Sequence, residues 1–169
     1  MLLIRDEGAK YRISVFFSEC INGLSATGNN ITLINQKENS NIFYKDIKQD
    51  ALNVILENNI PSSIARYLNV KQKFNSPSIL HSSYYRISKS KNVVNVLSVY
   101  DFNYERNLCG QLPKLIHSTQ KRHAIKNSDV IICISESTKS DLIKFYPFVN
   151  EKIIKVVYLA CDSRFSVSR

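Results

Sequence analysis

Four short apolar runs constrain the fold more than any other feature of the sequence. Each run is rich in β-branched residues and is apolar throughout instead of alternating with polar residues. They cover residues 78–80, 93–100, 130–134 and 153–159. Two stretches with helical character, residues 113–127 and 136–146, lie between the last three runs. Strands that are apolar on both faces and alternate with helices predict an α/β fold with a doubly wound, mainly parallel, Rossmann-like sheet.

The first part of the chain predicts a helix, a strand and a longer helical stretch. Apolar residues recur at helical spacing over residues 13–24, and Gly28 suits the end of that helix. Residues 31–34 are typical of a strand, and residues 44–70 of two helical pieces separated by Pro61. With 169 residues, of which 44% are hydrophobic, the chain has the length and composition of one folded domain with one core.

Charge and cysteine usage narrow the setting in which the protein works. Lys and Arg number 23 against 14 Asp and Glu, and the net charge of +9 indicates an anionic partner or surface. The four cysteines are scattered without a Cys-x-x-Cys motif, so we expect reduced core thiols instead of a metal site or disulfides, which points to the cytoplasm. Because no apolar stretch approaches about 20 residues, we expect any membrane contact to be peripheral.

The sequence contains none of the motifs that are typical of several common kinds of site. There is no Gly-x-Gly-x-x-Gly sequence and no P-loop sequence, so NAD binding and P-loop chemistry lose their main support. No His-rich or acidic cluster has the spacing of metal ligands, and no Ser-His-Asp or Gly-x-Ser-x-Gly pattern occurs. We therefore expect neither a resident metal ion nor a cofactor.

In a doubly wound sheet ligands bind beyond the carboxyl ends of the strands, so the residues after each apolar run are the candidates for a site. His81, Ser82 and Tyr84 follow the first of the four runs, together with a second tyrosine and Arg86. An imidazole, hydroxyls, phenols and a guanidinium can together hold a sugar or a phosphate. The alternative for His81 is a histidine that satisfies a hydrogen bond in the core.

Acidic and hydroxyl side chains follow the next two runs. Tyr100, Asp101 and Glu105 come after the second run, where either carboxylate can orient a hydroxyl nucleophile or act as a general base. An aspartate at this point also commonly forms a turn or caps a helix. Ser135 and Glu136 follow the third run, and helix capping with a favourable charge at the helix dipole explains them, with contact to an acceptor as the alternative.

Basic residues occur at two places where an anion can bind. Lys10 and Arg12 lie where the apolar start of the chain passes into the first helix, and they are either phosphate ligands at the helix N-terminus or solvated surface residues. Lys114, His117 and Lys121 share one face of the helix over residues 113–127. We expect that face to be solvated, with binding to anionic headgroups or nucleic acid as the alternative.

Several segments resemble, in order, the second half of the N-terminal domain of family-4 GT-B glycosyltransferases, enzymes of bacterial polysaccharide and lipopolysaccharide assembly. They are HSSYY (residues 81–85), VYDFNYE (residues 99–105) and HSTQKRHAIKNSDVIICISESTKSDLIKFYP (residues 117–147), followed by EKIIKVVYLACDSRF (residues 151–165), which is similar to the last strand and exit loop. KYRISVFFSECINGL (residues 10–24) resembles the KYGGISRYFxELINGL segment of that family.

The resemblance implies that residues 1–169 form one Rossmann-like half of a GT-B fold, the acceptor-side domain, with the C-terminal donor-binding domain absent. The family transfers a sugar from a nucleotide-diphosphate sugar with retention of configuration, generally without a metal, so the nucleotide-sugar is a co-substrate. On this basis we expect Tyr100 and Asp101 at the catalytic position. Residues expected near substrate are His81, Ser82, Tyr84, Glu105, Ser135 and Glu136, with Lys10 and Arg12 near phosphate.

The chain departs from the family pattern at three points. Tyr11 and Arg12 stand where the family has paired glycines, and Tyr100 stands where a histidine commonly precedes the aspartate. An unperturbed phenol titrates at about 10, so Tyr100 cannot serve as a near-neutral general base. The Glu-x7-Glu pair with which the family holds its donor does not occur.

These observations lead to two hypotheses from different classes. In the first, the chain is the acceptor-side domain of a glycosyltransferase with a glycan or lipid-linked acceptor, at the inner face of an anionic membrane, and has little or no transferase activity alone. In the second, it is a degenerate, non-catalytic Rossmann module that binds a protein partner or an anionic polymer, a reading that the Tyr11-Arg12 replacement favours. Nucleic-acid binding ranks third because no aromatic-basic interleaving is apparent.

Overall fold

A parallel sheet forms the centre of the protein. The computed structural model describes residues 2–3, 12–35, 52–57, 67–82, 84–106, 111–151 and 153–159. Its strands are β1 (Leu2–Leu3), β2 (Ile31–Asn35), β3 (Leu52–Leu56), β4 (Ser78–Ser82), β5 (Val93–Val99), β6 (Val130–Cys133) and β7 (Ile153–Val156). They form one 7-stranded sheet in the order β3-β2-β1-β4-β5-β6-β7, and each neighbouring pair is parallel. The predicted fold class is therefore confirmed.

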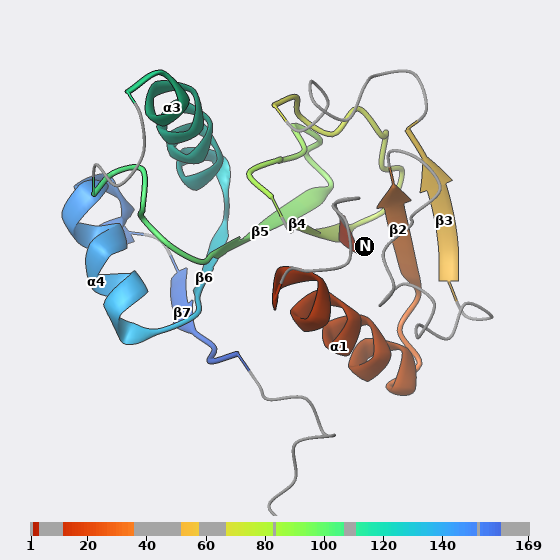
Figure 1. Ribbon diagram of the computed structural model, residues 1–169. Helices are drawn as coiled ribbons and strands as arrows, with labels where there is room; N and C mark the ends of the chain where they lie inside the picture. The colour runs from red at the N-terminus through yellow and green to blue at the C-terminus, as the bar shows by residue number, and fades with distance from the viewer. Residues whose placement is uncertain are drawn as a thin grey trace, which may run out of the picture.

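Helices cover the sheet from both sides (Figure 1). They are α1 (Arg12–Ala26), α3 (Gln111–Asn127) and α4 (Glu136–Phe145), followed by a short 3-10 helix over Pro147–Glu151. Phe17 of α1 packs on Leu33, which shares a sheet face with His81 because both pair with Leu2. The opposite face carries a larger cluster in which Leu97 and Ile131 of the sheet meet buried residues of α3 and α4. This arrangement makes the sheet doubly wound.

The strand order fixes where a ligand can bind. From β1 the chain moves outward through β2 to β3, then returns to β4 on the other side of β1 and continues to β7. The direction of winding reverses between β1 and β4, and in open parallel sheets the binding crevice lies outside the carboxyl ends of the strands at such a reversal. The segments after β4 and β5 therefore lie at the edge where a site is expected.

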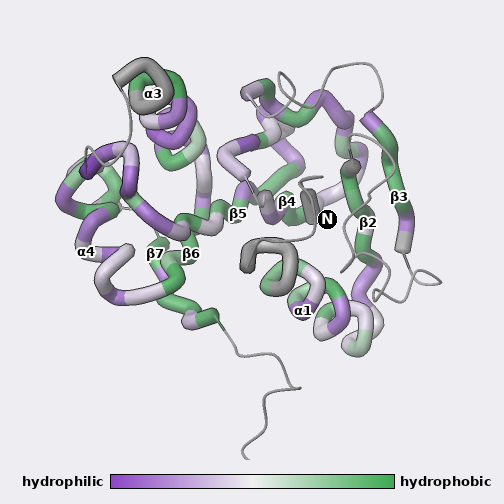
Figure 2. The backbone as a smooth tube through the Cα atoms, viewed as in Figure 1, coloured by the Kyte–Doolittle hydropathy of each residue, from purple (hydrophilic) through white to green (hydrophobic). Residues whose placement is uncertain are grey.

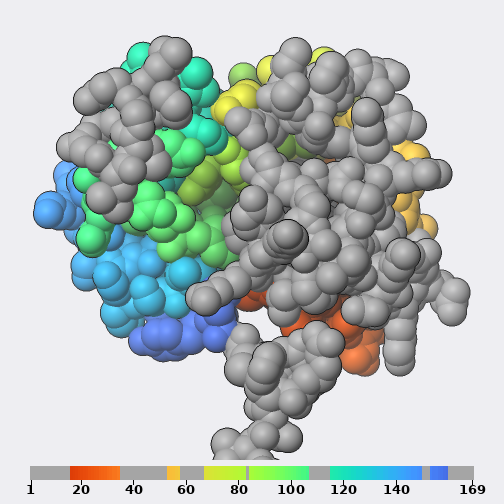
Figure 3. Space-filling model, viewed as in Figure 1, coloured from red at the N-terminus to blue at the C-terminus, as the bar shows by residue number. Residues whose placement is uncertain are grey.

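Hydropathy follows this architecture. Figure 2 shows hydrophobic residues along β2, β6 and β7 and more hydrophilic ones along α3 and α4. In the space-filling view the α3 and α4 segments gather on the left, and part of α1 is visible to their lower right (Figure 3). Among the described residues, no helix is both long and apolar enough to cross a membrane.

Most predicted elements coincide with observed ones. The helices predicted over residues 13–24, 113–127 and 136–146 match α1, α3 and α4 to within about two residues at each end, as is usual for helix boundaries. The thiol prediction is confirmed for Cys133, which is buried and free, and for Cys20, which is half-buried and free. Cys109 and Cys161 lie outside the described residues.

The prediction of helix over residues 44–70 was wrong where the structure describes that stretch. Residues 52–56 form β3, which pairs with β2 over its whole length, from Ile31↔Leu52 to Asn35↔Leu56. Residues 67–70 are not helical and end in an isolated bridge from Val70 to Ser88. The apolar residues of β3 fit a helix face and a strand equally well by spacing, so pairing with β2 decides the outcome. The other residues of this stretch, apart from Glu57, lie outside the described part.

A glycine ends α1 in the way the sequence predicts. Gly28 has a φ of +73°, and its N–H donates to the Ser25 carbonyl at 3.2 Å. The Asn29 N–H donates to the Leu24 carbonyl at 3.4 Å, so the bonds form a Schellman motif with Gly28 at its left-handed position.

Replacing Gly28 should therefore cost stability through backbone strain alone, because an added Cβ meets no atom within 4 Å. We expect Gly28→Ala to lower the free energy of unfolding by about 1 kcal/mol. Gly23 is the matched control, since it lies inside α1, where a Cβ also meets nothing within 4 Å. Gly23→Ala should raise the free energy of unfolding by up to about 1 kcal/mol, and urea denaturation of both variants tests the pair. Equal effects at the two positions would contradict the assigned helix end.

Candidate functional site

The turn after β4 is shaped by Ser82. Its buried hydroxyl donates to the carbonyl of Tyr84 and accepts from the Tyr84 N–H at 3.3 Å. The phenol oxygen of Tyr84 lies 3.0 Å from Nδ1 of His117 on α3. Tyr84 is therefore placed at the carboxyl edge, as predicted, whereas the Ser82 side chain is used by the turn itself.

Arg86, in the same turn, holds two distant segments together. Its Nε donates to the Leu68 carbonyl at 2.8 Å, and its Nη2 donates to Glu57 Oε2 at 2.8 Å. The guanidinium is almost fully buried, and its Nη1 makes no hydrogen bond to the described part of the chain. Glu57 directly follows β3, so this ion pair links the carboxyl ends of β3 and β4 on the two sides of β1.

His81 lies on the opposite face of the sheet from Ser82, because successive residues of a strand point to opposite sides. Its Nε2 is 2.8 Å from the Ser98 hydroxyl, and its ring centroid is 4.9 Å from that of Phe17 in α1. Burial lowers the pKa of His81 to about 4, so the imidazole is neutral at physiological pH. The structure supports the alternative of a hydrogen-bonded core histidine and does not bring His81 together with Ser82 and Tyr84.

Tyr100 shares that face with His81. It packs against the α1 cluster, with its ring centroid 6.5 Å from that of Phe16. Its hydroxyl is buried and makes no hydrogen bond of good geometry within the described part of the chain. Burial raises the pKa of Tyr100 well above its usual value, although the neighbouring Ser98 partly offsets this, so the phenol stays protonated. Tyr100 therefore cannot act as a base.

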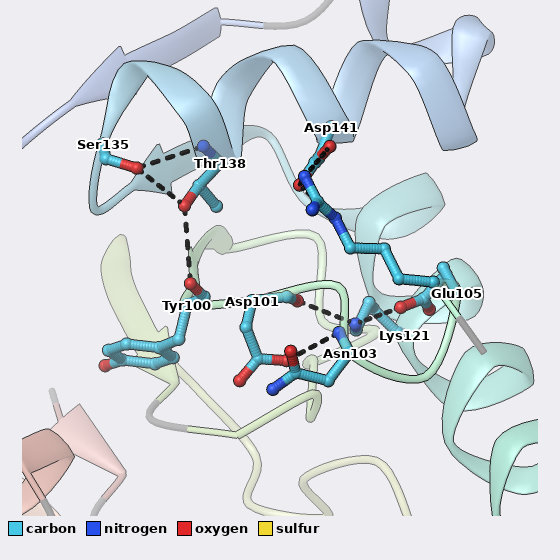
Figure 4. A network of polar contacts seen from close by, with 9 residues as sticks. Tyr100, Asp101, Asn103, Glu105, Lys121, Ser135, Thr138 and Asp141 are labelled. Carbon is cyan, nitrogen blue, oxygen red and sulfur yellow. Dashed lines mark hydrogen bonds and ion pairs between the residues drawn. The ribbon is translucent and has the colours of Figure 1, made fainter. Parts of the chain in front are cut away.

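Asp101 marks the point where the chain leaves β5. Its carboxylate accepts from the Asn103 N–H at 3.2 Å, which is the turn-forming role considered as an alternative. The side chain is nevertheless exposed. Figure 4 shows the carboxylate on the opposite side of the backbone from the Asp101 carbonyl, which accepts from Lys121 Nζ at 3.0 Å.

A buried ion pair lies behind this turn. Nζ of Lys121, on α3, donates to Glu105 Oε2 at 2.7 Å, and the two side chains are only 1% and 7% exposed. The ammonium also lies 4.6 Å from the centroid of the Phe102 ring. The second carboxylate oxygen of Glu105 accepts from the Tyr146 hydroxyl at 2.8 Å. The pair therefore joins the turn after β5 to α3 and to the end of α4.

The environment of Glu105 keeps it ionised. Burial by itself raises the pKa of the carboxyl, but the hydrogen bond and charge of Lys121, together with the Tyr146 hydroxyl, outweigh it and lower the pKa below its usual value. A carboxylate neutralised in this way holds the turn in shape and is a poor general base. Glu105 reaches the predicted edge, yet its oxygens are used by the protein.

The prediction of a solvated face on α3 was wrong. Lys121 is buried, and His117 is half-buried with its ring stacked on Tyr104 at 4.4 Å between centroids. The Lys114 side chain lies outside the described part. Helical spacing identifies which residues share a face, but it does not reveal that the Lys121 ammonium lies over the Phe102 ring and against a buried carboxylate.

Ser135 caps α4. Its hydroxyl accepts from the Thr138 N–H at 3.1 Å, and Thr138 in turn donates to the Tyr100 carbonyl at 3.4 Å. Glu136 is exposed in the first turn of the helix, where its charge suits the helix dipole. Capping therefore explains Ser135, and Glu136 is left facing solvent at the same edge.

Sequence reasoning missed a second clamp at this edge. Arg106 donates to both carboxylate oxygens of Asp141 on α4, with Nη2 at 2.8 and 2.7 Å and Nε at 3.1 Å. The two residues are 35 positions apart in the chain, so no local pattern could have paired them.

The predicted phosphate ligands remain a prediction. Lys10 lies outside the described residues, and Arg12 is the first residue of α1 with its side chain outside them. In the described part of the chain, no three His, Cys, Asp or Glu side chains are grouped so that they could hold a metal ion. Comparison of the chain with protein-family models and with curated proteins gave no match.

Breaking the buried Lys121–Glu105 pair should lower the free energy of unfolding far more than breaking the exposed Arg106–Asp141 pair. We expect Lys121→Met to lower the free energy of unfolding by about 3 kcal/mol or more, because it leaves Glu105 buried without its cation. Arg106→Met is the matched control, since the Arg106 side chain is 51% exposed and its loss should change stability little. Denaturant unfolding of both variants provides the comparison, and similar losses would contradict the different roles.

The lowered pKa of Glu105 makes the stability of the folded protein depend on pH. The folded state holds this carboxylate ionised at lower pH than the unfolded state does, so its stabilising contribution is present above pH 4.5 and is lost as the pH falls below that value. Glu105→Gln should lack this component. The difference in unfolding free energy between the native protein and this variant should therefore shrink on acidification below pH 4.5, and a constant difference would refute the assignment.

His81 should also lower the stability of the protein on acidification, and this loss begins at a higher pH than the loss due to Glu105. The unfolded imidazole binds its proton near pH 6.5 and the folded one near pH 4, so stability falls as the pH drops through this interval. Between pH 7.5 and 5 the loss due to His81 should be about 2 kcal/mol. It should disappear in His81→Gln and persist in His123→Gln, which replaces an exposed histidine. Denaturation at both pH values measures it, and an unchanged slope in His81→Gln would exclude this role.

Proposed function

We propose that the protein is the acceptor-side domain of a retaining glycosyltransferase of the family-4 GT-B type. It would act on a glycan or lipid-linked acceptor in the cytoplasm, in peripheral contact with the anionic inner face of the membrane. The observation that carries the proposal is the position of the segments that resemble that family. Residues 81–85 and 99–105 include the carboxyl ends of β4 and β5, next to the reversal of the sheet. That edge is where this fold class binds its ligands.

The residues available for substrate at this edge are fewer than the sequence alone predicts. Asp101, Tyr84 and Glu136 lie at strand ends with partly or fully exposed side chains. In the proposal, Asp101 orients the acceptor hydroxyl, and Tyr84, held by His117, lines the acceptor side. His81 and Tyr100 act as positioning residues that pack α1 against the sheet.

The reaction would be a group transfer with a simple balance. The bond between the anomeric carbon of the sugar and the diphosphate oxygen breaks, the nucleoside diphosphate leaves, and a bond forms from the anomeric carbon to the acceptor oxygen. The proton of the acceptor hydroxyl passes to the Asp101 carboxylate and from there to solvent, and such general-base assistance typically contributes about 10² to 10⁴ in rate. The net charge of +9 suits work near phosphates and anionic lipid.

A second candidate is favoured by the way the strand-end charges are used. Glu105 is neutralised by Lys121, Arg86 is paired with Glu57, and Ser135 caps a helix, so much of the polar edge serves the structure. A non-catalytic Rossmann module that binds a protein partner or an anionic polymer would need no more than this frame.

Transfer assays separate the two candidates. The chain should show no turnover alone with UDP- or GDP-sugars and should support transfer when a donor-binding C-terminal domain of the family is supplied. Within that pair Asp101→Asn should lower kcat by about 100-fold, whereas Glu19→Gln, an exposed change on α1, should leave it unchanged. Rapid turnover by the isolated chain would contradict the two-domain proposal, and absence of transfer with the supplied domain would favour the non-catalytic module.

A further inference from the structure

Apolar side chains are exposed on one face of the sheet over β5, β6 and β7. The register shows which residues share this face, because His81 lies against Phe17 of α1 and pairs with Val96, and paired residues point to the same side. Val96 pairs in turn with Val130, and Val130 with Ile153. We call the exposed part of this face the apolar sheet patch, and its residues are Ile79, Val94, Val130, Ile132, Ile153 and Val157.

The placement of the helices explains why this part of the sheet is open. α3 and α4 both pack on the opposite face, against Leu97 and Ile131. Of the described helices only α1 lies on the same face as the patch, and its buried residues pack on β2. The described link between β4 and β5, residues 84–92, contains no helix (Figure 1). Because parallel sheets are normally covered on both faces, the patch has the character of a surface that another element covers.

The patch is large and well exposed for an apolar surface. Four of its six side chains are between 44% and 58% exposed, namely Ile79, Val94, Ile153 and Val157. A cavity of about 670 Å³ adjoins the patch, and its lining includes Ile79 together with Leu24 near the end of α1, which is 43% exposed. A contiguous apolar patch of several hundred Å² on a folded chain marks an interaction surface.

Charge is almost absent from the patch. Among the described residues of β4 to β7 that point to this face, Lys155 is the only Lys, Arg, Asp or Glu, and it lies on the edge strand β7. At an edge the ammonium can reach solvent while its stem stays on apolar surface. A polyanion or an acidic protein would find little to pair with here. The partner that fits is a surface as apolar as the patch itself.

A second copy of the chain offers such a surface. Two sheet faces pack on each other about 10 Å apart with interdigitating side chains, and a two-fold axis places the same patch on both sides of the interface. The β-branched isoleucines and valines are already restricted at χ1, so they lose little freedom on packing. The patch with Leu24 offers roughly 500 Å² per copy, so that a pair buries about 1,000 Å², the lower limit for a specific interface.

We propose that the protein forms a symmetric dimer in which the apolar sheet patches of two copies pack face to face. The net charge of +9 on each copy opposes their approach, and salt screens this repulsion. Association should therefore strengthen as salt is raised, whereas a complex with a polyanion weakens. The dimer uses none of the residues assigned to substrate. It goes beyond the proposed transfer function, and failure of either proposal leaves the other standing.

Sedimentation equilibrium of the full chain tests the dimer without any sugar. Over chain concentrations from about 1 to 200 µM we expect a monomer–dimer equilibrium with a Kd of about 10 to 100 µM, as suits an interface of this size. Raising NaCl from about 0.1 to 0.5 M should lower the Kd about threefold or more. A chain that stays monomeric at the highest concentration, or a dimer that dissociates as salt is raised, would overturn the proposal.

Variants then locate the interface. Ile79→Lys and Ile153→Lys each place a charge in the patch at an exposed position and should raise the Kd about tenfold or more. Leu115→Lys is the matched control, because it adds the same charge at a residue that is 66% exposed on α3, the helix on the opposite face. Val94→Ser removes apolar surface without adding charge and should raise the Kd by a smaller factor.

Urea unfolding of each variant confirms that the substituted chains remain folded, so that a lost dimer reports on the interface. A dimer that persists in both Ile79→Lys and Ile153→Lys, or one that Leu115→Lys weakens to the same extent, would place the contact elsewhere and contradict the proposal.

Discussion

The buried ammonium of Lys121 is the interaction on which the carboxyl edge of the sheet depends. Removing an ammonium from water costs several kcal/mol unless nearly all of its hydrogen bonds and charge are compensated. Here the compensation comes from Glu105, the Asp101 carbonyl and the Phe102 ring, which all belong to the turn after β5. The turn can therefore adopt this shape only while α3 is packed so that Lys121 contacts it.

The Lys121–Glu105 pair is also connected to α4, through the second carboxylate oxygen of Glu105. Tyr146, at the end of α4, donates to Glu105, and the Arg106–Asp141 clamp adds another link between the turn and α4. The elements that frame the edge on this side of the sheet are thus tied to a single turn. This frame explains why Glu105 and Ser135 serve the structure while Asp101, on the outer side of the turn, stays exposed to solvent.

The sequence was sufficient for the architecture because the relevant signals are local. Apolar runs identify β4, β5, β6 and β7, and the Ser135 cap and Gly28 identify helix ends from single residues. β3 could not be predicted in this way, because its spacing fits a helix as well and only pairing with β2 selects the strand.

The site was less predictable, for a related reason. Position after a strand correctly placed Tyr84, Asp101 and Glu105 at one edge, but it could not tell the alternating faces apart, so His81 and Tyr100 were expected there and lie under α1 instead. Whether a polar residue is free for a ligand depends on partners far away in the chain, such as Lys121 for Glu105. Burial of a charged side chain is a tertiary property that spacing does not encode.

A double-mutant cycle on Lys121 and Glu105 measures how strongly the two buried side chains depend on each other. It compares the unfolding free energies of Lys121→Met, Glu105→Gln, the double variant and the native protein. If the pair organises the carboxyl edge, the double variant should be more stable than the sum of the single losses predicts, with a coupling energy of about 2 kcal/mol or more. Additivity within about 0.5 kcal/mol would show that the two residues act independently and would contradict the account.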